Sequence, residues 1–134
     1  METTQHEKMN VPSDNPITET ENGKTYTNVL RVKSDPPGTT DEDRKKNVKK
    51  LAGAIAHNIR RFGEVHVRAG GKESVYKAIK AIIEARGMVA VHGHDLYVSP
   101  GYMVIGNLED KTEMTGMSFY VITSTSTSNG SQTN

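Results

Sequence analysis

Two amphipathic helical segments, joined by one short strand, constrain the fold of this chain more than any other feature of its sequence. The first runs from residue 41 to residue 62, where apolar side chains recur three or four positions apart; they are Val48, Leu51, Ala52, Ile55, Ile59 and Phe62. Three acidic residues open this segment and two arginines close it, which matches the partial charges at the ends of a helix. Thr40 or Asp41 can cap its start, and Gly63 can end it. The pattern therefore predicts one long helix.

The remaining periodicities predict a second helix and four strands. A helical stripe runs over residues 72–86, and we expect Gly87 to close that helix. Alternating or β-branched runs predict strands over residues 26–33, 64–69, 95–106 and 115–122. Within the third of these strands, Pro100–Gly101 indicates a bulge or kink.

The resulting order is β-α-β-α-β-β, with residues 107–114 as the loop between the last two strands. Two helices are too few to cover both faces of a four-stranded sheet. We therefore predict an α+β fold in which a four-stranded sheet carries both helices on one face. The other face would be open to solvent, to a partner subunit or to a ligand.

The folded part is predicted to be one domain, residues 26–122, between two polar segments. Residues 1–25 have too little apolar surface to offset the cost of ordering, so we expect a disordered arm. Residues 123–134, "TSTSTSNGSQTN", are of low complexity and predict a flexible tail. The chain has no cysteine, which excludes disulfides and thiolate metal sites. It shows neither a signal-peptide pattern nor a run of ~20 apolar residues, so we expect a cytoplasmic protein.

Charge is distributed unevenly along the chain, although the net charge is only +1. Residues 1–28 hold two lysines and five acidic residues, a net charge of −3, whereas residues 44–80 hold eleven basic and two acidic residues, a net charge of +9. The densest cluster is "RKKNVKK", residues 44–50. A helix dipole disfavours cations near the N-terminus, so their presence there favours contact with a polyanion over a merely solvated helix start.

A second candidate is "RAGGKESV", residues 68–75, where two glycines lie between basic residues. Backbone N–H groups at the start of a helix form a generic anion site. The alternative is a tight strand-to-helix turn that only glycine can make. The stretch has neither the GxxxxGK[ST] nor the GxGxxG spacing, so we expect no nucleotide cofactor.

We predict that phosphate contacts come from the basic helix, the glycine turn and the cations close to them: Lys33, Arg44, Lys45, Lys46, Lys49, Lys50, Arg60, Arg61, Arg68, Gly70, Gly71 and Lys72. Arg60 and Arg61 have a simpler alternative, because cations stabilise a helix C-terminus without any ligand.

The sequence carries little that points to catalysis or to a metal. Nothing pairs a nucleophile with a base at a telling spacing, so we expect a protein that is not an enzyme. His92 and His94 flank a glycine, but they complete no recognised metal spacing, and we expect no metal. Tyr97 and Tyr102 are the best candidates for stacking on bases, with packing in a core or an interface as the alternative.

Several of these segments together resemble the stage V sporulation protein S family. The stretch Leu51–Met103 carries the small-residue helix "LAGAIA", the glycine turn, the helix "AIKAIIEARG" and the run "DLYVSP", and the first strand "VLRVK" and the final hairpin also fit. The resemblance covers about residues 29–122. That family is similar in fold to the Alba superfamily of small dimeric nucleic-acid-binding proteins, which has the same β-α-β-α-β-β order.

The resemblance implies a binding surface made of the loop after the first strand, the start of the first helix and the last hairpin, presented as a pair by a dimer. This chain differs in an extra stretch, "DPPGTTDEDRKK", residues 35–46, and in longer tails. Its hairpin loop, residues 106–114, is net acidic, and acid there would repel phosphate.

We therefore expect a non-enzymatic nucleic-acid-binding protein of low sequence specificity, acting as a dimer or larger assembly, with RNA or single strands slightly favoured over duplex DNA. The alternative is a protein–protein regulator or assembly factor, whose basic face would meet an acidic partner.

Overall fold

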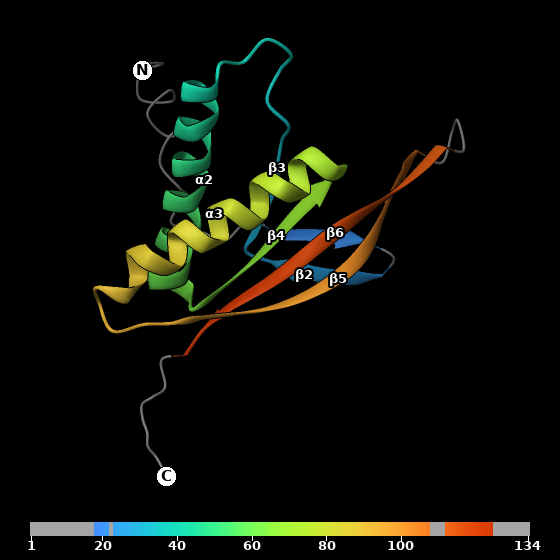
Figure 1. Cartoon of the computed structure of the whole chain (residues 1–134). Coiled ribbons are helices and arrows are strands. Elements are labelled where there is room, and N and C mark those ends of the chain that lie inside the picture. The colour runs from blue at the N-terminus through green and yellow to red at the C-terminus, as the bar shows by residue number, and fades with distance from the viewer. Residues whose placement is uncertain (1–17, 22, 108–111, 125–134) are drawn as a thin grey trace, which may run out of the picture.

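A computed structural model of the chain describes residues 18–21, 23–107 and 112–124. These residues form two helices, a four-stranded mixed sheet and a separate two-stranded hairpin (Figure 1). The elements are β1 (Thr18–Glu21), β2 (Lys24–Thr27), β3 (Val29–Val32), α2 (Asp41–Phe62), β4 (Glu64–Gly70), α3 (Lys72–Ala90), β5 (Leu96–Asn107) and β6 (Thr112–Thr123). The predicted α+β class is confirmed, and the arrangement fits an Alba-like fold.

The four-stranded sheet has the order β3-β4-β6-β5. β3 and β4 run parallel, whereas β4 with β6 and β6 with β5 are antiparallel. Because β3 and β4 are parallel, their carboxyl ends lie at the same edge of the sheet. The loops that lead into α2 and α3 therefore both begin at that edge of the sheet. The loop after β3 then leads up to the N-terminal end of α2, and the N-terminal half of this helix extends above α3 (Figure 1).

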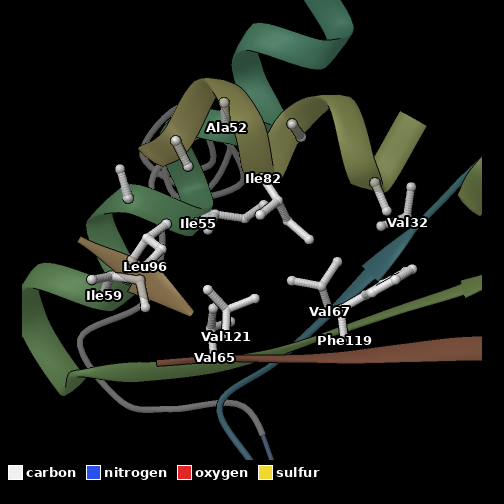
Figure 2. Packing of buried hydrophobic residues seen from close by; sticks show 14 of the residues in the cluster. Val32, Ala52, Ile55, Ile59, Val65, Val67, Ile82, Leu96, Phe119 and Val121 are labelled. Carbon is white, nitrogen blue, oxygen red and sulfur yellow. The ribbon is translucent and has the colours of Figure 1, made fainter. Parts of the chain in front are cut away.

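The hydrophobic core lies between the two helices and one face of the sheet (Figure 2). β4 alternates, so that Val65, Val67 and Ala69 point toward the helices and are fully buried. Ile55 of α2 is buried to the same extent, and the small side chains of α3 let the helices and strands approach closely; these are Ala78, Ala81 and Ala85. Both helices thus cover one face of the sheet, as predicted. Truncating a side chain such as Ile55 to alanine would cost about 2–5 kcal/mol.

The first helix begins and ends at the predicted residues. The Thr40 side chain accepts a hydrogen bond of 3.1 Å from the Asp43 backbone N–H, which caps the N-terminus. Gly63 adopts a left-handed conformation with φ 81°, and its N–H donates to the Ile59 carbonyl at 2.8 Å. Capping chemistry written in the sequence therefore sets both ends of α2.

The predicted end of the second helix at Gly87 is wrong, and so is the bulge that was one of two alternatives at Pro100–Gly101. α3 continues through Gly87 to Ala90, because fully buried Val89 keeps the next turn packed in the core, and the left-handed turn comes at Gly93 with φ 84°. The pairing of β5 with β6 runs in continuous register past Pro100, so the described pairing contains no bulge there. β5 is an edge strand, so the backbone position at which Pro100 lacks an N–H can face away from the sheet.

The structure also differs from the prediction at the N-terminal boundary. Thr18–Glu21 and Lys24–Thr27, most of which were expected in a disordered arm, pair as the β1–β2 hairpin. The predicted strand 26–33 is divided at Asn28, which adopts φ 60° between β2 and β3. The hairpin lies against the sheet face opposite the helices, where Tyr26 contacts His66 of β4. That face is therefore partly covered by the chain itself.

The C-terminal boundary moves by two residues. β6 continues to Thr123, and the Ser124 N–H donates to the Asp95 carbonyl at 2.9 Å. The other residues of the predicted arm and tail, 1–17, 22 and 125–134, lie outside the described residues.

Candidate nucleic-acid interface

Asp35, in the loop after β3, holds that loop against both helices. Its carboxylate accepts hydrogen bonds from Lys77 Nζ at 2.9 Å and from Asn47 Nδ2 at 2.8 Å, and Arg44 lies at 3.8 Å. Only 7% of the Asp35 side chain is exposed. The hydrogen bond from Lys77 is the largest cause that holds the pKa of Asp35 below its usual value, against the opposing effect of burial, with Asn47 and Arg44 adding to it. Asp35 therefore stays ionised and keeps the loop in place.

Two further contacts bring the start of α3 to the same place. Lys77 Nζ also donates to the Lys33 carbonyl at 2.8 Å, and the hydroxyls of Ser34 and Ser74 lie 2.8 Å apart. The loop after β3, the start of α2 and the start of α3 thus form one surface. Sequence reasoning did not single out Asp35 or Lys77, because a lone acid in a loop and a lone lysine in a helix carry no recognisable spacing.

Four lysines of α2 that are close in sequence to the Asp35 contacts Arg44 and Asn47 are exposed; they are Lys45, Lys46, Lys49 and Lys50. Lys49 Nζ lies 3.6 Å from a Glu84 carboxylate oxygen of α3, but 71% of the lysine side chain is exposed. A solvent-exposed pair of this kind contributes ~0–1 kcal/mol, so it restrains Lys49 only weakly. Arg44 is half-buried against Asp35, and Lys33 is exposed at the base of the loop. These six residues form what we call the basic surface.

The glycine turn lies near the basic surface at the start of α3. Gly71 has φ 86° and ψ 154°, a conformation that side chains rarely adopt, which confirms that the turn requires glycine here. The helix start has no side-chain cap, and Lys72 is exposed beside it. Gly71 and Lys72 line a hollow together with Val75, Tyr76, Ile79, Thr115 and Met117. Most of that lining is apolar, so the turn offers phosphate a limited surface.

Arg60 and Arg61 do not lie with the basic surface. They are in the last turn of α2, fifteen residues beyond Lys45, which corresponds to about 22 Å along the helix. Both are exposed, and the Arg61 guanidinium lies 5.8 Å from the centre of the Phe62 ring. Their position fits the simpler alternative, in which they interact with the C-terminal end of the helix dipole.

Arg68 lies on the opposite face of the sheet from the glycine turn that follows it. Its side chain is 3% exposed, and its guanidinium is 3.2 Å from the Glu19 carboxylate and 5.0 Å from the centre of the Tyr26 ring. Alternation along β4 is the reason, because Val67 and Ala69 face the helices. In this conformation Arg68 is covered by the β1–β2 hairpin and cannot join the basic surface.

The two tyrosines expected to stack on bases point in opposite directions. Tyr97 and Tyr102 are both exposed, at 57% and 80%. In register, Tyr102 lies opposite Met117, which packs against the core on the helix side, whereas Tyr97 lies opposite Ile122 on the other face. They therefore cannot form one stacking platform within a single chain. The side chains of the acidic hairpin loop, residues 106–114, lie outside the described residues.

No three His, Cys, Asp or Glu side chains of the described residues gather closely enough to hold a metal ion. Neither α2 nor α3, the helices that the structure describes, is long and apolar enough to cross a membrane.

Comparison with known proteins relates the chain to a family. The family model of stage V sporulation protein S (SpoVS) matches residues 43–124, which is more than half of the chain. The match begins in the first turn of α2 and includes β4, α3, β5 and β6. The β1–β2 hairpin, β3 and the Asp35 loop precede it. A search among curated proteins finds no match to the chain.

Proposed function

The chain belongs to the stage V sporulation protein S family, and on that premise we propose that it is a non-enzymatic nucleic-acid-binding protein of low sequence specificity. RNA or single-stranded nucleic acid is the preferred ligand, and the protein acts as a dimer or larger assembly. Its cations contact phosphates, and base edges are read little, which makes the binding weakly specific.

The observation that carries the proposal is the gathering of exposed lysines on one surface. Lys45, Lys46, Lys49 and Lys50 are exposed on two turns of α2, and the Asp35–Lys77 ion pair holds the loop that leads into this helix. A row of mobile cations on a fixed support binds a phosphate backbone by releasing its counterions. The surface also contains three exposed acidic residues in the first turn of α2, so we expect moderate affinity.

Self-association is supported by an apolar strip on the outer side of α3 and on β5. Tyr76, Ile79 and Ile83 recur at helical spacing along α3 and are 65%, 41% and 64% exposed. Val98 and Tyr102 of β5 continue the strip at 39% and 80% exposure. Contiguous exposed apolar surface of this kind is typical of interaction sites. A second copy of the chain, related by a two-fold axis, would bury the same strip on both partners and double the basic surface.

Fluorescence anisotropy with labelled single-stranded RNA, single-stranded DNA and duplex DNA tests the proposal. We expect binding at ~50 mM salt that weakens steeply as salt rises. Reversing charge at the four lysines of α2 (K45E/K46E/K49E/K50E, the helix-reversed variant) should weaken binding to all sequences alike. Absence of binding to all three ligands would reject the proposal and would favour the alternative, an acidic protein partner.

A further inference from the structure

The sheet face opposite the helices carries cations and aromatic rings from three adjacent strands. Arg31 of β3 lies beside Arg68 of β4, and His66 of β4 lies beside Tyr120 of β6. The His66 and Tyr120 rings are stacked, with centroids 4.6 Å apart and an interplanar angle of 20°. A flat ring with two guanidiniums two residues further along offers one place for a base and one for a phosphate.

The β1–β2 hairpin supplies both kinds of group to this face. The Glu19 carboxylate accepts from Arg31 Nε at 2.7 Å, from the second Arg31 nitrogen at 2.9 Å and from Arg68 at 3.2 Å. One anion is thus held between two guanidiniums, as a phosphate would be. The Tyr26 ring meets the edge of His66 at 5.4 Å and lies 5.0 Å from the Arg68 guanidinium. The hairpin therefore occupies the face with one negative charge and one aromatic ring.

The hairpin is joined to the domain in a way that lets it separate from the sheet. It forms a sheet of its own and connects to β3 through Asn28, at φ 60°. Asn28 itself is fixed to β4, because its side-chain amide donates to the Glu64 carbonyl and its own carbonyl accepts from the His66 N–H at 2.9 Å. The pairing of β3 therefore does not depend on the hairpin. A two-stranded hairpin alone is marginally stable, so its undocking is governed by the loss of its contacts with Arg31, Arg68 and His66.

We propose that this sheet face is a second binding surface for single-stranded nucleic acid and that the β1–β2 hairpin occupies it in cis. A base stacks on His66 in place of Tyr26, and a phosphate replaces Glu19 between Arg31 and Arg68. The ligand class rests on the proposed function, but the surface is separate from the basic surface of α2. Among the described side chains of the four-stranded sheet, Glu64 is the acid on this face, and it accepts a hydrogen bond from the Tyr120 hydroxyl, so two arginines face one described glutamate once Glu19 leaves.

The test measures this face without the contribution of α2. In the full-length helix-reversed variant, Glu19→Gln is added, and binding of labelled single-stranded RNA and DNA is followed by anisotropy. A cover that leaves a site open in a tenth of the molecules weakens its apparent affinity about tenfold. We therefore expect Glu19→Gln to tighten binding by up to about tenfold. Adding Arg31→Gln should abolish the gain. Asp95→Asn, which removes the same charge from an ion pair with Arg86 elsewhere, is the matched control.

The possible results separate this inference from the proposed function. If Glu19→Gln binds no more tightly than Asp95→Asn, or if its gain survives Arg31→Gln, the second surface is rejected even where the wild-type chain binds through α2. If the wild-type chain shows no binding and the Glu19→Gln variant does bind, the basic surface is rejected and the second surface stands. Tyr26→Ser, which removes the ring and keeps Glu19, should give a smaller gain in the same direction. If circular dichroism shows that the Glu19→Gln variant is unfolded, the Tyr26→Ser variant is used as the test. A folded Tyr26→Ser variant that binds no more tightly would then reject the second surface.

Discussion

The Lys77 ammonium lies 2.9 Å from the Asp35 carboxylate, and this ion pair helps to join the loop after β3 to α3. Both side chains are largely shielded, at 16% and 7% exposure. Lys77 also binds the Lys33 carbonyl, and Asp35 also binds Asn47 of α2, so the pair is the centre of a small network. The position of the basic surface relative to the sheet depends on this network, and four measurements follow from it and from the neighbouring features.

Replacing Asp35 with alanine should destabilise the domain and loosen the loop. Hydrogen bonds to charged groups contribute about 1.5–3 kcal/mol, and the change leaves Lys77 without its carboxylate partner. We expect the free energy of unfolding, measured in urea, to fall by about 2 kcal/mol. Lys49→Ala, which breaks the exposed pair with Glu84, is the control and should change stability by less than about 1 kcal/mol. Equal losses in the two variants would show that Asp35 does not organise the loop.

The two ends of α2 should differ in their effect on nucleic-acid binding. Lys49→Gln/Lys50→Gln and Arg60→Gln/Arg61→Gln each remove two positive charges, so they change net charge equally. For single strands, each lost phosphate contact lowers the slope of log affinity against log salt by about 0.7. We expect a slope reduced by up to ~1.4 in the lysine variant and an unchanged slope in the arginine variant. Equal reductions would mean that binding follows net charge and not the basic surface.

A charge on the apolar strip should prevent self-association. Ile83→Glu places a carboxylate in the middle of that strip, where burial against a partner would leave it unpaired and costly. Sedimentation velocity should then show a monomer where the wild-type chain forms a dimer. Val91→Glu is the matched control, because Val91 is 78% exposed just after the end of α3 and lies outside the strip. A wild-type chain that is monomeric at all concentrations would reject the dimer.

The stability of the domain should decrease on mild acidification because of His66. Burial is the largest cause that lowers the pKa of His66 below its usual 6.5, Arg68 adds to this, and Glu64 opposes it. The unfolded chain therefore binds more protons than the folded chain between the lowered pKa of folded His66 and about pH 6.5, so folding weakens as pH falls through that range. The rings of Tyr26 and Tyr120 pack against the imidazole and leave little room for water around a charge.

His66→Phe isolates this effect, since it keeps an aromatic ring beside Tyr120 and removes the titrating group. Urea unfolding at pH 7.5 and at pH 5.5 should show a smaller loss of stability in the variant than in the wild-type chain. The carboxyl of Asp35, whose pKa is lowered, contributes to the pH dependence only at more acidic values, near and below its usual 3.8. An identical loss in both chains would assign the pH dependence to other groups.

Local sequence signals predicted the regular elements well. The bounds of α2 followed from the apolar stripe, the Thr40 cap and Gly63, all of which act within a few residues of one another. The glycine turn and the order of the elements from β3 onward were predicted for the same reason, whereas the β1–β2 hairpin was missed. The prediction that α3 ends at Gly87 was wrong because buried Val89, which packs against distant elements, outweighs the local preference of glycine. The prediction of a bulge at Pro100 was wrong because only the sheet order shows that β5 is an edge strand.

Some features of the candidate site could likewise be predicted from local sequence, whereas others depend on the tertiary structure. The exposure of the α2 lysines could be predicted, because the apolar stripe settles which side of the helix is buried. The separation of Arg60 and Arg61 from them could be anticipated from helix length alone. The burial of Arg68 could not, because the covering residues Glu19 and Tyr26 belong to a polar segment with no apolar pattern of its own.

By itself, the sequence determined, to within a few residues, where the elements from β3 onward form, where α2 is capped, and which of its sides carries the lysines, because propensity, periodicity and capping act over a few residues. Tertiary structure decided that the Asp35 loop joins α2 to α3, that Arg31 and Arg68 share one carboxylate, and that Tyr97 and Tyr102 face opposite sides of the sheet. These relationships arise from strand register and from ion pairs between residues 12 to 49 positions apart. No local pattern encodes such contacts, since their energy becomes available only when the folded backbone brings the partners together.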